Sequence, residues 1–555
     1  MLQEGRLRRL CFCLFLCFIV LLGRLFWIQV FTGHDLMVSG IKQRTLSINL
    51  SPARGEILDR KGRKLTSVYA EDRLVVFPAL SHDDQRLSSL LSKITRESQD
   101  NLKRRLEDGA PFLLFPRNLQ PLAGASSWLR ENGVIRHRLR LRYSPGDMAA
   151  HLIGYVSPKD GHGIMGIESA FDDYLASDSA YKLLAYVDAR NMLIPGLGYR
   201  IVAPSGQGGW NLVLTISCDI QEIVEHVADE RLPRGAIVVM DPHTGEILAM
   251  TTRPTFDPNN PSAAFGKPGA PFVNRAVLPY PPGSIMKVLV AAAALQEGIV
   301  TCDEEFTDKG YVDVGGVRFK CYKADEGGHG RISFTDAMAE SCNSVFIDVG
   351  QRLGRRKLIE YMEACGLGGI TGLGIPEERP GSIPDLWHMS LQDLANASIG
   401  QGQVTATPLQ VATLMSAIAN GGEVVRPKVV LEVRGNDGLL LKSFPTVQKK
   451  KVFRPEVTAL VRQMLRQTVL SGTGREAETI CPSGAAGKTG TSETGKVIDG
   501  KPVTHAWFAG YVPADEPAMV IVVLSEEGGS GGGVAAPIFR EIANKVISLV
   551  DTHTF

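Results

Sequence analysis

The chain has 555 residues, and its 60 Lys and Arg against 59 Asp and Glu give a net charge of +1. This balance lacks the basic excess of a nucleic-acid-binding protein, so we expect no nucleic-acid partner. Hydrophobic residues make up 44% and charged residues 21%, which excludes a mainly disordered or fibrous chain. A chain of this length is too long for one hydrophobic core, and we expect several domains.

An apolar stretch over residues 10–31 predicts a single transmembrane anchor. As a helix it is long enough to cross a hydrocarbon core of about 30 Å. Arginines 6, 8 and 9 precede it, which predicts that residues 1–9 are cytoplasmic and that the chain after residue 31 is extracytoplasmic. A cleaved signal peptide is the alternative, but no cleavage site with small residues follows the stretch.

Residues 32–232 contain short segments of alternating polarity, such as residues 73–77, which predict a mostly β domain. One polar stretch, residues 83–107, is typical of a helix. A Gly-, Pro- and Ser-rich patch at 203–209 is followed by a predicted strand at 211–216 and a predicted helix at 220–230. We place the domain junction after residue 232.

Residues 233–555 predict an α+β domain. It begins with a predicted hairpin, and an Ala-rich apolar helix follows in its first third. Two late strands and a final helix complete the pattern. The predicted elements are strands 236–240 and 247–250, helix 286–295, strands 506–511 and 518–524, and helix 537–550.

Ser284 and Lys287 form an S-x-x-K motif at the start of the Ala-rich helix. A serine hydroxyl needs an adjacent base to act as a nucleophile. Residues three apart lie on one helix face, and apolar neighbours of Lys287 would lower its pKa, which favours a base. Backbone N–H groups at the helix start could stabilise an oxyanion. The motif alone is common by chance.

Two further motifs follow in order. Ser341 and Asn343 form S-x-N, and residues 488–491 form K-T-G-T. S-x-x-K, S-x-N and K-T-G in this order are typical of class A β-lactamases and penicillin-binding proteins.

With these motifs, nearly the whole chain resembles the class B penicillin-binding proteins, which are membrane-anchored peptidoglycan transpeptidases. Residues 54–62, 142–155 and 163–168 look like the family's pedestal motifs, and residues 399–410 and 532–539 look like further family signatures. The resemblance implies a pedestal domain over residues 32–232 and a transpeptidase domain over residues 233–555. The pedestal-motif residues, to which we assign a structural part, are Arg54, Gly55, Asp59, Arg60, Gly62, Arg142, Gly146, His151 and Glu168.

The resemblance also implies a role for each motif residue. Ser284 would attack the carbonyl between two D-alanines of a peptidoglycan stem peptide, and Lys287 would take its proton. Ser341 would relay a proton to the leaving D-alanine, and Asn343 would hold the substrate amide. Lys488 would tune Ser341, while Thr489 and Thr491 would bind the terminal carboxylate, with Gly490 between them in the substrate-binding segment. The mechanism would use no metal and no cofactor.

Several alternatives stay open. A β-lactamase would need a water-activating carboxylate and would not explain the pedestal. A D,D-carboxypeptidase differs only in the acceptor, and a non-catalytic β-lactam sensor or scaffold would not need Ser284. The resemblance implies a bacterial membrane protein and a partner glycosyltransferase of the polytopic SEDS (shape, elongation, division and sporulation) group, which acts on lipid-linked glycan. We favour division, with other divisome proteins as partners, over a spore-cortex role, although residues 310–330 also resemble spore-cortex proteins.

Cys302 and Cys321 flank a predicted hairpin at Gly315 and Gly316. A chain that doubles back there would bring the two cysteines together, and an extracytoplasmic location permits oxidation. We therefore expect a disulfide between them, with two separate thiols as the alternative.

Overall fold

The computed structural model describes residues 2–52, 54–95, 97–116, 125–144, 148–157, 160–177, 180–194, 196–202, 209–445, 449–498 and 500–552. The chain forms two compact units. The first unit contains residues 1–53, 70–140 and 178–207, and the second contains residues 54–69, 141–177 and 208–555.

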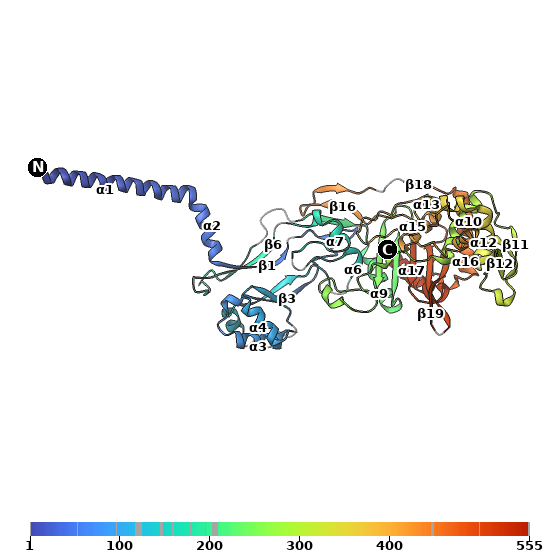
Figure 1. The fold of residues 1–555 in the computed structure, drawn as a ribbon, viewed down its shortest axis with the longest axis horizontal. Helices are drawn as coiled ribbons and strands as arrows, with labels where there is room; N and C mark the ends of the chain where they lie inside the picture. Colours follow the sequence, from blue (N-terminus) through green and yellow to red (C-terminus); the bar gives the residue numbers. More distant parts are fainter. Residues whose placement is uncertain are drawn as a thin grey trace. The chain divides into compact units, whose positions relative to one another are not determined.

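The first unit begins with the predicted apolar helix. α1 (Leu2–Trp27) continues through a π-helical turn, η1 (Ile28–Thr32), into α2 (Gly33–Gln43). Residues 5–37 are long and apolar enough to cross a membrane. The apolar side chains of this segment, such as Phe12 and Leu21, are exposed, as a lipid-facing helix requires. These features fit a membrane anchor (Figure 1).

Two antiparallel sheets complete the first unit. One has the order β1-β6-β7, and the other has the order β4-β3-β5 and packs against α3 and α4. The predicted helix at 83–107 is two helices, because Ser98 caps a second helix by accepting a hydrogen bond from the Asn101 N–H. The elements are β1 (Thr45–Pro52), β3 (Ala70–Val76), α3 (Asp84–Ile94), α4 (Gln99–Glu107), β4 (Phe112–Leu114), α5 (Ser126–Glu131), β5 (Val134–Arg140), β6 (Ala180–Tyr186) and β7 (Tyr199–Val202).

The second unit takes in three segments upstream of residue 233. A sheet of order β17-β16-β8-β2 joins two of them, residues 54–69 and 208–232, to the C-terminal part: β2 pairs in parallel with β8, which pairs with β16. Backbone pairing therefore divides the chain differently from the predicted junction after residue 232. The elements are β2 (Ile57–Leu58), α6 (Ala150–Ile153), α7 (Gly166–Ala170), α8 (Asp172–Leu175), β8 (Asn211–Leu214), β16 (Val430–Arg434) and β17 (Leu440–Ser443).

The central sheet of the second unit has five antiparallel strands in the order β10-β9-β21-β20-β19. Alternate residues of β9 pack on opposite sides: Ile237 lies in one core with α9 and α17, and Val238 lies in another with α10 and α15. This helix–sheet–helix arrangement confirms the α+β prediction (Figure 1). The elements are α9 (Cys218–Arg231), β9 (Gly235–Met240), β10 (Ile247–Arg253), α10 (Met286–Gln296), α15 (Pro408–Ala419), α16 (Pro455–Leu470), β19 (Ala486–Ile498), β20 (Lys501–Val512), β21 (Met519–Ser525) and α17 (Ala536–Thr552).

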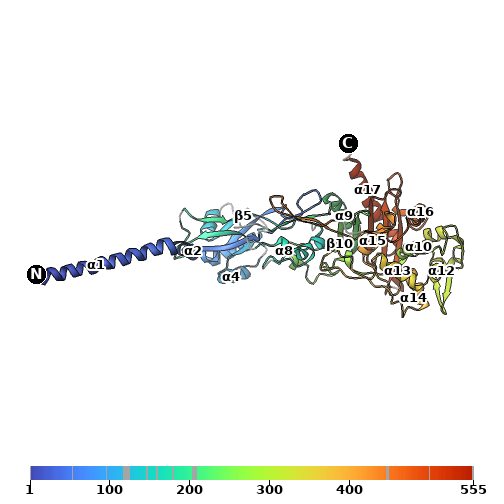
Figure 2. The same ribbon diagram turned by 90° about the horizontal axis from the view of Figure 1, so that it is seen from above.

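Helices α12, α13 and α14 of the second unit pack against α10 (Figure 2), and the unit also contains three two-stranded sheets, β11-β14, β12-β13 and β15-β18. The predicted hairpin at Gly315 and Gly316 is present, with Val314 paired to Val317. The elements are β11 (Glu305–Asp308), β12 (Tyr311–Val314), β13 (Val317–Lys320), β14 (Gly330–Ser333), α11 (Phe334–Ala339), α12 (Asn343–Leu353), α13 (Arg355–Ala364), α14 (Leu391–Ser398), β15 (Glu423–Val424) and β18 (Lys450–Lys451).

Candidate active site

Ser284 lies in a 3-10 turn, η6 (Gly283–Ile285), that leads directly into α10. Gly283 has φ +55°, a conformation that favours glycine, and its N–H donates to the Gly400 carbonyl at 2.9 Å. A Cβ on Gly283 would lie 2.7 Å from the Thr491 carbonyl oxygen. The turn therefore packs against β19, and Ser284 is partly exposed beside the third motif.

Lys287 is fully buried one helical turn later and joins the first motif to the second. Its ammonium donates to the Ser341 carbonyl at 2.6 Å, to Ser341 Oγ at 3.3 Å and to Asn343 Oδ1 at 2.7 Å. Burial lowers the pKa of Lys287 to about 8, because a buried site disfavours the charged form.

Ser341 lies in the turn between α11 and α12 with φ +57°. This left-handed conformation costs a non-glycine residue about 1–3 kcal/mol, and such strain is common at functional sites. Asn343, the first residue of α12, donates from Nδ2 to the Lys320 carbonyl at 3.2 Å. Helix α12 and the β13 end thus position the second motif against Lys287.

The third motif lies on β19, at the edge of the central sheet. Lys488 is fully buried, and its pKa is well below the usual value because of burial and, secondly, the charge of Lys287. The hydroxyls of Thr489 and Thr473 are 2.7 Å apart, and the exposed Thr491 accepts from the Gly531 N–H at 3.3 Å. Contacts with Thr473 and Gly531 therefore help to hold this strand segment in place.

Glycines allow these segments to approach. A Cβ on Gly490 would lie 2.8 Å from the Pro282 carbonyl oxygen and 3.0 Å from Ile285 Cγ1. Gly400, in the family signature at residues 399–402, supports the Ser284 turn, and Trp507 Nε1 donates to the Pro281 carbonyl at 3.1 Å. The sequence shows Gly400 and Trp507, but nothing in their local pattern indicates that they contact this turn.

A buried ion-pair network lies among the pedestal-motif residues. Glu168 is fully buried and accepts from Arg54 Nε at 2.6 Å and from Arg142 Nε at 2.7 Å, one arginine on each carboxylate oxygen. Arg142 also donates to the Gly55 carbonyl at 2.7 Å, and Arg54 pairs with Asp172 at 2.6 Å. The network ties together three segments far apart in the sequence.

The other pedestal-motif residues make separate contacts. Asp59 accepts from the backbone N–H of Lys61 and of Arg63, each at 2.8 Å, in a turn that includes Gly62 at φ +78°. Arg60 pairs with Glu246 at 3.1 Å. His151 is buried, with Nε2 2.7 Å from the Pro271 carbonyl oxygen, and burial lowers its pKa to about 4. Gly146 lies outside the described residues.

The expected disulfide between Cys302 and Cys321 is wrong for this structure, in which both are free thiols. The hairpin returns the chain to Gly310, whose carbonyl accepts from the Cys321 N–H at 2.8 Å, rather than to Cys302. Cys321 instead lies against Cys342, with the sulfurs 4.0 Å apart.

Comparison with known proteins identifies the family of this chain. Residues 235–544 match the penicillin binding protein transpeptidase domain. The chain is 30% identical over 548 residues to stage V sporulation protein D of Bacillus subtilis, covering 95% of this chain and 82% of that protein. It is 29% identical over 565 residues to the peptidoglycan D,D-transpeptidase FtsI of Escherichia coli K12, covering 98% of this chain and 91% of that protein.

A solved structure shows the same fold. The apo form of penicillin binding protein 3 from Mycobacterium tuberculosis superposes with a TM-score of 0.65 and 26% identity, covering 91% of this chain and 97% of that chain. The matched domain spans more than half of the sequence, and the relatives align over nearly all of it. The chain therefore belongs to the class B penicillin-binding proteins.

Proposed function

We propose that this chain is a peptidoglycan D,D-transpeptidase in which Ser284 is the nucleophile and Lys287 its base. One observation carries the proposal: the buried Lys287 amine lies one helical turn after Ser284 and is hydrogen-bonded to both functional residues of S-x-N. A base with a pKa of about 8 is partly neutral near physiological pH and can accept the serine proton.

In acylation, Ser284 Oγ attacks the carbonyl carbon between the two terminal D-alanines while its proton moves to Lys287. The oxyanion accepts from the backbone N–H groups of Ser284 and Thr491, an assignment that the close packing of η6 against β19 supports. Ser341 passes a proton to the leaving D-alanine nitrogen as the C–N bond breaks. The product is an ester between Ser284 and the shortened stem peptide.

Strand β19 supplies the substrate-binding groups. As an edge strand it can pair with an extended peptide, and Asn343 can hold the substrate amide. Thr489 and Thr491 offer hydroxyls to the terminal carboxylate, and Gly490 keeps the strand close to the Ser284 turn. An amine of a second stem peptide then attacks the ester and regenerates the Ser284 hydroxyl, which forms the cross-link.

Covalent labelling with fluorescent penicillin tests the nucleophile. We expect the wild type to label and Ser284→Ala to lose labelling while keeping its thermal unfolding midpoint, because the change removes one partly exposed atom. Labelling of the alanine variant would contradict the assignment, and an unlabelled wild type would favour a scaffold.

A second assay separates the candidate reactions. Incubation with a D-alanyl-D-alanine stem peptide and an acceptor amine, followed by mass spectrometry, should yield the cross-linked product with release of D-alanine. Release of D-alanine without cross-link would show a carboxypeptidase. Rapid turnover of penicillin would show a β-lactamase.

We further propose that N-terminal anchoring leaves residues 1–9 cytoplasmic and the active site extracytoplasmic, based on the arginines before the apolar helix. We place the enzyme in the division machinery with a SEDS-family glycosyltransferase as partner. The spore cortex is the second candidate, because one relative is named for stage V of sporulation. A tagged full-length copy at the septum of growing cells would support division, and a signal confined to sporulating cells would support the cortex.

A further inference from the structure

Glu340, the residue directly before Ser341, has a carboxylate that the proposed reaction does not use. It follows the last residue of α11, and its side chain is 32% exposed. Its Oε2 accepts from the Tyr322 hydroxyl at 3.0 Å. Within the part of the chain that the structure describes, its Oε1 has no hydrogen-bond partner. One carboxylate oxygen is therefore held in place, and the other is open to a ligand.

Glu340 lies between the second and third motifs. Ser341 follows it, and the carbonyl of Ala339, on its other side, accepts from the Thr473 N–H at 3.0 Å. The Thr473 hydroxyl is in turn 2.7 Å from the hydroxyl of Thr489. A chain of two contacts therefore links the turn that carries Glu340 to the substrate-binding strand β19.

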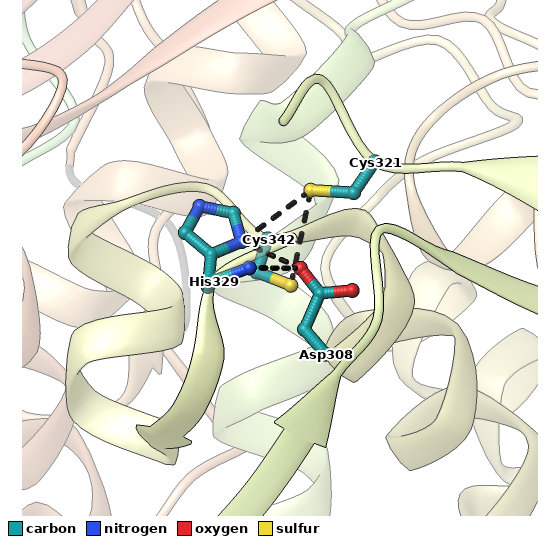
Figure 3. Close-up of side chains that lie close together, drawn as sticks. All are labelled: Asp308, Cys321, His329 and Cys342. Atoms are coloured by element: carbon teal, nitrogen blue, oxygen red, sulfur yellow. Dashed lines mark hydrogen bonds and ion pairs between the residues drawn. The ribbon is translucent and has the colours of Figure 1, made fainter. Parts of the chain in front are cut away.

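The segment that carries Tyr322 is fixed against the same turn. Asn343 donates from Nδ2 to the Lys320 carbonyl at 3.2 Å. Figure 3 shows the side chains of Cys321 and Cys342, one on each segment, pointing toward each other, and their sulfurs are 4.0 Å apart. Tyr322 and Glu340 are thus presented by two segments that are held together independently of their own contact.

The active site contains two buried lysines, which any cationic substrate has to approach. Lys287 and Lys488 are both fully buried. Burial and, secondly, the charge of Lys287 lower the pKa of Lys488, whereas the negative charge of Glu340 acts on this pKa in the opposite direction. Glu340 is therefore close enough to offset part of the positive potential of the lysines.

The second substrate of a transpeptidase is such a cation. An alkyl amine has a pKa of about 10.4, so the acceptor reaches the enzyme as an ammonium ion near neutral pH. A protonated lysine in the site repels this ion, and a carboxylate at the rim attracts it. The acceptor therefore needs a negative group beside the second motif, and Glu340 supplies one.

We propose that Glu340 binds the ammonium group of the acceptor stem peptide before that amine attacks the acyl-enzyme. The inference rests on the proposed function and names the group that its second step recognises, a primary alkyl amine. Oε1 binds the ammonium, while the Tyr322 hydroxyl keeps Oε2 in place. Lys323 Nζ is 3.7 Å from Oε2, near the limit of an ion pair, and both side chains are 32% exposed. Such a loose surface pair is weak, so Lys323 can move away as the acceptor arrives.

The chemical step leaves Glu340 unchanged. The bound ammonium gives one proton to solvent water and becomes a neutral nucleophile. Its nitrogen forms an amide bond with the acyl carbon, the C–O bond of the Ser284 ester breaks, and a second amine proton passes to Ser284 Oγ. Glu340 therefore raises the occupancy of the acceptor and lowers its KM, with little effect on the rate at saturation.

Cross-linking by the full-length protein in detergent tests the proposal with two acceptors. One is a stem peptide with a free side-chain amine, which is cationic, and the other is hydroxylamine, which is uncharged at neutral pH. With a D-alanyl-D-alanine stem peptide as donor, Glu340→Gln should raise the KM of the cationic acceptor by about tenfold, the effect of losing one hydrogen bond to a charged group. Its KM for hydroxylamine should stay at the wild-type value.

Three variants serve as controls. Glu340→Asp keeps the charge and should recover part of the lost affinity for the amine. Lys323→Met removes the neighbouring cation and should not raise the KM, so that an effect of Glu340→Gln cannot come from loss of this ion pair. Glu363→Gln removes an exposed carboxylate on α13 and should leave both KM values unchanged.

Penicillin acylation provides a separate readout of the first step. Glu340→Gln should be acylated at the wild-type rate, because no acceptor takes part. A wild type that penicillin does not acylate would overturn the proposed function and this inference with it. Normal acylation with an unchanged KM for the amine in Glu340→Gln would overturn only the role of Glu340. An equal rise in KM for both acceptors, or loss of acylation in Glu340→Gln, would show damage to the Ser341 turn and refute acceptor binding.

Discussion

Replacing Glu168 by Gln tests whether the buried ion-pair network stabilises the second unit. The carboxylate is fully buried, with Arg54 on one oxygen at 2.6 Å and Arg142 on the other at 2.7 Å. Glutamine keeps the shape but removes the charge, and its NH₂ group would face an arginine donor. Two buried guanidinium groups would then share a neutral amide.

The expected loss of stability follows from the burial of the ion pair. Removing one partner of a buried pair costs about 3–5 kcal/mol, because the other charge is left uncompensated. Arg54 keeps its contact with Asp172, so we expect Glu168→Gln to lie near the lower end of that range. The matched control is Glu476→Gln: Glu476 pairs with Arg540 at 3.1 Å, and their side chains are 60% and 40% exposed. A surface pair contributes about 0–1 kcal/mol.

Urea unfolding of the two full-length variants, followed by tryptophan fluorescence, measures the difference. We expect the midpoint of Glu168→Gln to fall well below that of Glu476→Gln, with similar dependence on urea concentration. In the absence of urea both variants should label with penicillin at the wild-type rate, because none of these residues contacts the three motifs. Equal midpoints would refute the reasoning.

Three further predictions concern the active site, each read from the rate of penicillin acylation. Lys287→Ala should slow acylation by about 10²–10⁴-fold, the range for loss of a positioned base, and a near-normal rate would point to another base. Burial lowers the pKa of Lys287 to about 8, and the neutral amine is the active form of the base. The wild-type acylation rate should therefore rise with pH through about 8 and then level off. A rate that does not change with pH would contradict the assignment of Lys287 as the base. Gly490→Ala should slow acylation at least about tenfold, because its Cβ would lie 2.8 Å from the Pro282 carbonyl oxygen, while Gly369→Ala, which has open space, should not.

Local patterns in the sequence predict much of the second unit. The hairpin at residues 236–250 forms as β9 and β10, the Ala-rich helix forms as α10, and the last helix forms as α17. Each of these elements is encoded by its own periodicity and by nearby turn residues. The order of the three motifs likewise indicates a shared site, although only the structure gives the contacts of Lys287 with Ser341 and Asn343.

Contacts between distant segments could not be predicted in this way. The pairing of β2 with β8 assigns residues 54–69 to the second unit, and no local pattern shows it. The partner of Cys321 depends on where the β12–β13 hairpin returns, which is set by a backbone bond to Gly310. Spacing along the chain favours Cys302, whereas the fold selects Cys342.

The buried lysines of the active site lower the stability of the folded protein. The burial that causes this loss is also what makes Lys287 a base. Lys287 has a pKa of about 8 in the folded protein and about 10.5 in the unfolded chain, so between these values the unfolded chain binds the extra proton. Stability therefore rises with pH through this window, and below about pH 8 the full cost of about 3 kcal/mol is present. Lys488 adds to it, since it is also buried and its pKa is lowered further by the charge of Lys287. The strained Ser341 turn contributes in the same direction. Packing around α10 and the five-stranded sheet must offset these costs, because the same desolvation that destabilises the two lysines makes a neutral amine available beside Ser284.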